Sequence, residues 1–159
     1  MTNTTITERK VINVKKILTI VLLIGAGIFS AYCSTYDNVA KWGLYYVVLM
    51  GIGLVAMIYS TYKDVIPAIQ EYSSKLPKNL IDTAKMIERS FKKELVLLAA
   101  FLIISIIIYA NITSIIETYS LNLNYGANAL FYTMICFSAY TLKDMMGACK
   151  TLREAGIID

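Results

Sequence analysis

The sequence predicts an all-α polytopic membrane protein, with four transmembrane helices arranged as two parallel-repeat hairpins with cytoplasmic helical extensions. Hydrophobic residues make up 57% of the 159 positions and charged residues only 16%, which departs in both respects from an ordinary soluble domain. The apolar residues gather in four nearly uncharged segments, and the two halves of the chain resemble each other at a fixed spacing. These observations together predict the fold class.

The four apolar segments cover residues 17–33, 42–62, 95–116 and 125–142. A helix needs about 20 apolar residues to cross the hydrocarbon core of a bilayer, whereas a buried strand is much shorter. Each segment therefore predicts a transmembrane helix. The charged segment 63–94 between the two pairs predicts a helical turnaround, and the chain (1–159) is expected to form a single membrane domain.

Basic residues are distributed unequally over the connections. All but one of the 15 Lys and Arg residues lie before the first apolar segment, in the middle segment or after the last one, and the exception is Lys41. Because loops rich in Lys and Arg stay in the cytoplasm, we expect both termini and residues 63–94 on the cytoplasmic side. The expected location is a bacterial inner membrane.

An internal repeat relates the two halves of the chain. Residues 8–77 align with residues 88–157 without a gap, at a shift of 80 positions, and the alignment contains twelve identities. Charged residues match in this alignment, for example Lys63-Asp64 with Lys143-Asp144. Since each half has an even number of spans, the two copies are expected to be parallel, related by an axis along the membrane normal.

The second and fourth predicted helices are expected to continue beyond the membrane. Apolar residues follow each segment at helical spacing and form one stripe per copy: Val65, Ile69 and Tyr72, then Met145, Cys149 and Leu152. Pro67 and Gly147 occupy equivalent positions in the two copies, so a kink or a helix end is expected at either.

Basic residues in the extensions are candidates for docking a partner or lipid headgroups: Lys75, Lys78, Lys85, Arg89, Lys92, Lys93, Lys143, Lys150 and Arg153. The two arms of the middle segment can instead pack on each other, or lie on anionic lipid. Acidic residues alternate with these cations and a membrane lies beside them, so no nucleic-acid partner is expected.

Small residues are candidates for helix packing and self-association: Gly25, Ala26, Gly27, Ala31, Gly51 and Gly53. Uncharged polar residues within the spans are candidates for an intramembrane role, namely Tyr109, Asn111 and Asn128. An amide is costly against lipid, so the two Asn side chains are expected either to bond across the fourth helix or to line a polar vestibule.

No catalytic, metal or cofactor pattern is present. The chain contains no histidine, and its acidic residues fall outside the centres of the predicted spans, so neither a paired-acid site nor a proton relay is expected. Three cysteines, at positions 33, 136 and 149, form no ligand or disulfide pattern. We therefore expect a protein that is not an enzyme and holds no cofactor.

These features favour a non-enzymatic integral subunit that forms homo-oligomers in the lipid bilayer and docks a cytosolic or membrane partner through its basic extensions. The membrane component of an antiphage defence or secretion assembly fits this description. Two alternatives remain open. One is a small oligomeric channel, with Tyr109, Asn111 and Asn128 near its outer mouth and apolar rings that gate by dewetting. The other is a membrane immunity or exclusion protein.

Overall fold

The computed structural model describes residues 3–33, 36–75, 78–118 and 121–158, and within these ranges the chain is all-helical, without strands. The elements are α1 (Asn3–Cys33), α2 (Tyr36–Ser60), the π-helical turn η1 (Thr61–Val65), α3 (Ile66–Ser74), α4 (Lys78–Thr118) and α5 (Leu121–Glu154). The all-α prediction is therefore confirmed for the described residues.

Three stretches of these helices are long and apolar enough to cross a membrane: Lys15–Cys33, Trp42–Ser74 and Ile81–Asn111. Of the most apolar 18 residues in each, only 11%, 6% and 22% respectively are buried within the chain. Such extensive exposed apolar surface requires lipid or a partner to cover it. The fourth predicted span, 125–142, lies within α5. It is not among these three stretches, because α5 is less apolar than α1, α2 and α4.

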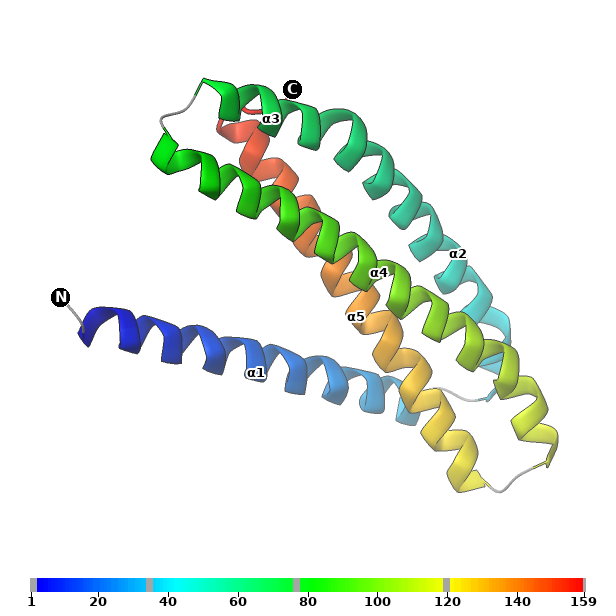
Figure 1. Ribbon diagram of the computed structural model, residues 1–159. Helices are drawn as coiled ribbons and strands as arrows, with labels where there is room; N and C mark the ends of the chain where they lie inside the picture. The colour runs from blue at the N-terminus through cyan, green and yellow to red at the C-terminus, as the bar shows by residue number, and fades with distance from the viewer. Residues whose placement is uncertain (1–2, 34–35, 76–77, 119–120, 159) are drawn as a thin grey trace.

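Helix α5 lies at the centre of the arrangement. It packs against α1, α2 and α4, and α4 also packs against α2 and α3. Figure 1 shows α2 with α3, α4 and α5 running side by side, whereas α1 meets α5 near its own C-terminal end and diverges toward its N-terminus. Within the described residues, α1 and α2 make very little direct contact.

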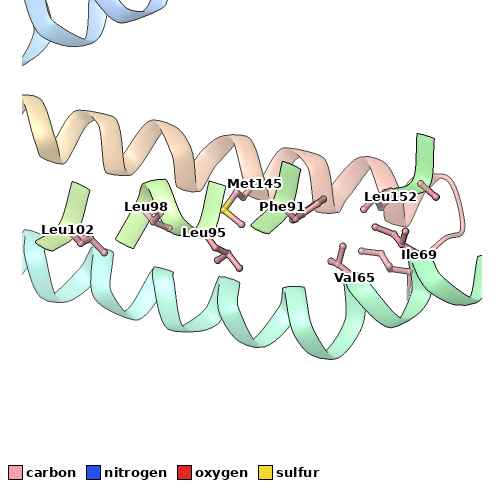
Figure 2. Close-up of a cluster of buried hydrophobic side chains, with 10 residues drawn as sticks. Val65, Ile69, Phe91, Leu95, Leu98, Leu102, Met145 and Leu152 are labelled. Carbon is pink, nitrogen blue, oxygen red and sulfur yellow. The ribbon is translucent and has the colours of Figure 1, made fainter. Parts of the chain in front are cut away.

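The main hydrophobic core joins α3, α4 and α5, and most of it is shown in Figure 2. Val65 and Ile69 of the first predicted stripe face Met145 and Leu152 of the second, and Phe91 of α4 lies in the same cluster. The core continues along α4 through Leu95, Leu98 and Leu102. The spacing of these residues places them on one face of α4, which explains why this long helix stays attached to its neighbours.

Pro67 accounts for the π-helical turn between α2 and α3. A proline has no backbone N–H, and its ring crowds the carbonyl four residues earlier, here that of Lys63. Before it, Ile66 donates its N–H to the carbonyl of Thr61, five residues earlier. The wider turn therefore accommodates Pro67 while the helix continues to Ser74. In the second half, α5 passes through Gly147 without interruption.

The helices are longer than a bilayer is thick. Helix α4 contains 41 residues, which corresponds to a length of about 60 Å, roughly twice the hydrocarbon thickness of about 30 Å. Helix α5 contains 34 residues. The excess length forms a helical region at one end of the molecule, where α3, the start of α4, the end of α5 and the C-terminus meet (Figure 1).

Candidate docking surface at the basic end

We call this region, residues 61–94 together with 143–158, the basic end. The exposed surface of α4 shows how it is bounded: Lys85, Arg89 and Lys92 are exposed on the first turns, whereas Val96 and Ile103 are exposed farther along. The change from charged to apolar side chains occurs within about one helical turn. This boundary fits a helix that leaves an aqueous region and enters lipid.

Four cations of α4 share one side of the helix. Lys85, Arg89, Lys92 and Lys93 follow the spacing i, i+4, i+7 and i+8 and are all exposed, so they form a basic strip along α4. Lys92 donates to the Glu88 carboxylate at 2.6 Å. The continuous α4 helix thus brings these four predicted docking residues onto one side.

The remaining predicted cations lie at the end of α3, at the start of α4 and on α5. Lys75 pairs with Glu71 at 2.7 Å, and Lys150 lies 3.8 Å from Glu154. Exposed pairs of this kind are screened by solvent and add little stability. Lys143 and Arg153 are also exposed. Lys78 begins α4, but its side chain falls outside the described part of the chain.

Two adjacent apolar grooves flank α4 at the basic end. One, of about 230 Å³, lies between α3, α4 and the C-terminal residues, with Tyr72 and Leu152 in its wall. The other, of about 290 Å³, lies between α4 and α5 and is lined by Met86 and Ala148 among others. Both are lined by Thr83 and Ile87 of α4. We call them the paired grooves.

The C-terminal residues line one side of the groove between α3 and α4. Helix α5 ends at Glu154, and Gly156 after it has φ of 67°, a conformation that glycine adopts without steric cost. Gly156 donates its N–H to the carbonyl of Arg153 at 2.9 Å, and Ile157 donates to that of Leu152 at 3.0 Å. This is the Schellman hydrogen-bond pattern. It turns the chain back so that Ile158 is buried in the main core.

Sequence analysis missed this C-terminal turn. The available signal was a glycine directly after the charged last turn of α5, followed by two isoleucines, because the residue after such a glycine commonly packs back on its helix. Beside the turn, a polar pocket of about 540 Å³ is lined by η1, α3 and the C-terminal residues. Its charged lining is mixed in sign: Lys63, Asp64, Glu71 and Lys75.

The small residues proposed for packing fall into two groups. Gly27 lies so close to α5 that an added Cβ would clash with the Oγ1 of Thr133 and lie 2.7 Å from its Cα, and Ala31 is buried beside it. Gly53 is in similar contact with Leu142, where an added Cβ would lie 2.7 Å from a methyl carbon. These contacts join α1 and α2 to α5.

The other group faces outward. Gly25 and Gly51 have open space where a Cβ would stand, and Ala26 is exposed. Gly43 was not among the predicted packing residues. It lies against the Tyr109 ring, where an added Cβ would be 2.7 Å from a ring carbon. Its position beside Trp42 gave no clear sign of this close approach.

The polar residues proposed within the spans have different surroundings. The Tyr109 ring packs against Phe131 with centroids 5.8 Å apart. The exposed Asn111 amide donates to the carbonyl of Ile107 at 2.7 Å, within its own helix. Asn128 is buried, and its Oδ1 has no hydrogen-bond partner among the described residues. Of the three, Asn128 is therefore the residue with a buried oxygen that accepts no hydrogen bond from the described residues.

Other buried hydroxyls of α5 are satisfied within the helix. Thr133, Ser138 and Thr141 each donate to the carbonyl four residues earlier, at 2.7 to 2.9 Å. Burial raises the pKa of the Cys149 thiol at the basic end, although the Ser60 hydroxyl and the charge of Arg153 oppose this shift. Among the described residues, no group of three His, Cys, Asp or Glu side chains could hold a metal ion.

The fold and surface define a helical protein with three stretches able to cross a membrane, which indicates a membrane location. No protein-family model matches the chain, and no curated protein or solved structure matches it.

Proposed function

We propose that this chain is a non-enzymatic subunit of a bacterial inner-membrane assembly, which self-associates and docks a protein partner at its basic end. The membrane component of a defence or secretion assembly is the kind of role that fits. The observation that carries the proposal is the combination at one end of the molecule of two apolar grooves with exposed cations around them.

The proposal includes four transmembrane helices, with α5 as the fourth. The polar side chains that lower its hydropathy are largely buried by the surrounding helices, as at Asn128, Thr133 and Ser138. The hydroxyls are also bonded to the helix backbone. A central helix can therefore carry these groups across a bilayer without presenting them to lipid, which is where their cost would be high.

The basic end is proposed to lie in the cytoplasm, together with both termini. The support is the positive-inside rule, applied to the exposed cations of α3, α4 and α5 and to Lys15 and Lys16 of α1. Moving a single Lys through the bilayer centre costs about 2.5 to 3.5 kcal/mol on the insertion scale. The opposite orientation would require many such transfers.

The paired grooves favour an amphipathic helix as the docked element. Met86, on the rim of the groove between α4 and α5, is 66% exposed, and a flexible thioether adapts to many apolar partners. Arg89 follows Met86 on the outer side of α4, and Lys85 precedes it. A partner helix with apolar residues on one face and acidic residues beside them would match this surface.

A site-specific photocrosslinker tests this assignment in cells. Placed at Met86, it is expected to give a discrete protein adduct that disappears when Lys85 and Arg89 are both changed to Glu. The matched control is Val96, which is equally exposed on α4 but on its apolar part, and which is expected to give no such adduct. If Met86 gave only lipid adducts, the basic end would be a headgroup-binding surface and the protein-docking proposal would be wrong.

A further inference from the structure

The two halves of the chain align in sequence, yet their hairpins pack differently. In the second half, α4 packs along α5, and two ring pairs mark the contact: Phe101 with Phe137 at 5.2 Å between centroids, and Tyr109 with Phe131 at 5.8 Å. In the first half, α1 and α2 make very little contact within the described residues. The first hairpin therefore lacks the contact that holds the second one together.

The corresponding faces of the first hairpin are apolar and uncovered. On α5, the residues Asn128, Phe131, Ile135 and Ser138 are all buried. The residues 80 positions earlier, on α2, are Val48, Gly51, Val55 and Ile58; the three larger side chains are 42% to 66% exposed, and Gly51 faces open space. An apolar groove of about 630 Å³ runs along this side of α2 and is lined by Val48, Gly51, Ile52, Val55, Ala56 and Tyr59.

A similar comparison holds for α1. Leu98 and Leu102 of α4 are buried, whereas the identical residues 80 positions earlier, Leu18 and Leu22, are 57% and 63% exposed. Helix α1 contacts its own α5 through the side that carries Gly27 and Ala31. The helical spacing places Leu18, Val21, Gly25 and Phe29 on roughly the opposite side, so this second side of α1 has no cover from α5.

We propose that a second copy of this chain supplies the missing contact, with α1 of each protomer packed in the α2 groove of the other. The register follows from the second hairpin. The Tyr109–Phe131 contact corresponds to Phe29 against Gly51, and the Phe101–Phe137 contact corresponds to Val21 against Met57. The same antiparallel register brings Gly25 to Val55. Phe29 and Val55 thus each meet a glycine, which allows the close helix packing found in membranes.

A reciprocal arrangement satisfies both protomers at once. If α1 of each chain packs on α2 of the other, the interface is isologous and closes as a two-fold dimer. The axis then lies along the membrane normal, because both protomers must have the same orientation in the bilayer. This inference rests on the self-association in the proposed function. It identifies the surface through which the two copies associate.

Disulfide crosslinking between two differently tagged copies tests the interface. One copy carries Phe29→Cys and the other Gly51→Cys, in a background from which the native cysteines have been removed. Oxidation in membranes is expected to join the two tags. The control replaces Phe29→Cys with Ile107→Cys, an exposed apolar position on α4, and is expected to give no joined product. A single chain with both Phe29→Cys and Gly51→Cys distinguishes contact between copies from contact within one.

Gly51→Leu provides a second measurement of the same surface. Since a Cβ at Gly51 meets nothing in the protomer, the larger side chain can be accommodated there, but it fills the groove. We expect the dimer fraction in lipid vesicles, counted by single-molecule photobleaching, to fall at least tenfold. The control is Gly147→Leu, which is equally open but lies on α5 at the basic end, and is expected to leave that fraction unchanged.

The possible results separate this interface from the proposed function. A dimer that forms without the Phe29–Gly51 crosslink, or that survives Gly51→Leu, would overturn the interface but leave self-association standing. A crosslink confined to one chain would also overturn it, because α1 would then close on its own α2. A protein that remains monomeric in lipid at every concentration would overturn both the interface and the self-association.

Discussion

Gly27 of α1 lies directly against Thr133 of α5, where no larger residue fits without movement of the backbone. We expect Gly27→Leu to destabilise the folded protein by about 1–3 kcal/mol, because overpacking of a close contact forces neighbouring atoms apart. Reversible unfolding in detergent, followed by circular dichroism or steric trapping, measures the change.

The matched control for this variant is Gly126→Ala on α5, where an added Cβ meets nothing. Alanine is the better helix former by about 1 kcal/mol in a helix interior, so this variant should be neutral or slightly more stable. Equal stability of Gly27→Leu and the unmodified protein would show that α1 does not pack on α5 as the structure has it.

The turn at Gly156 is expected to stabilise the basic end. Gly156→Val should cost about 1–2 kcal/mol, because a side chain at a left-handed position is strained, and β-branched residues tolerate it least. Hydrogen exchange at Ile157 should increase as its bond to the Leu152 carbonyl is lost. Gly147→Ala, in the uninterrupted part of α5, is the control and should not increase exchange there. Unchanged protection of Ile157 in Gly156→Val would contradict the role of the turn.

The buried stripe of α4 provides a third prediction. Leu98 is fully buried and Val96, two residues earlier, is 68% exposed. Leu98→Ala should reduce the free energy of unfolding by about 2–5 kcal/mol, since it removes contacts and leaves a cavity. Val96→Ala should change it by less than about 0.5 kcal/mol. Similar losses for both variants would mean that α4 is rotated relative to the structure described.

The thiol of Cys149 should react slowly at neutral pH. Burial raises its pKa, so a smaller fraction is present as thiolate, which is the reactive form. The comparison uses two variants of the solubilised protein, each with a single cysteine. At pH 7, maleimide should label Cys149 more slowly than the cysteine of Ala155→Cys, an exposed position directly after α5. Because the pKa of Cys149 is raised, its labelling rate should continue to increase at pH values above those at which an exposed thiol is fully ionised. Equal labelling rates at pH 7 would contradict the partly buried position of Cys149.

Much of the helical architecture follows from the sequence, because long apolar segments and i, i+4, i+7 stripes depend on local periodicity. Val65, Ile69, Met145 and Leu152 were predicted as stripes, and the structure places all four in one core. The π-helical turn before Pro67 was less predictable in detail. A proline indicates a local disturbance, but whether the helix kinks, ends or widens depends on its neighbours.

The relative placement of the helices could not be derived in this way. Sequence similarity between the halves predicts equivalent hairpins, yet α1 lies away from α2 while α4 lies along α5. Gly25 and Gly27 illustrate the difficulty, since both are small residues in one apolar run and only Gly27 meets another helix. The face that a membrane helix uses is decided by pairwise packing, which hydrophobic composition alone does not determine.

The central claim is that the basic end lies in the cytoplasm with two short connections outside, and impermeant maleimide labelling of intact cells tests it most directly. In a cysteine-free background, Asn38→Cys and Ser120→Cys are expected to be labelled from outside. Ser74→Cys and Ala155→Cys are expected to be labelled only after the cells are permeabilised. Labelling of Ser74→Cys in intact cells would contradict the orientation, and with it the assignment of the paired grooves as a cytoplasmic docking surface.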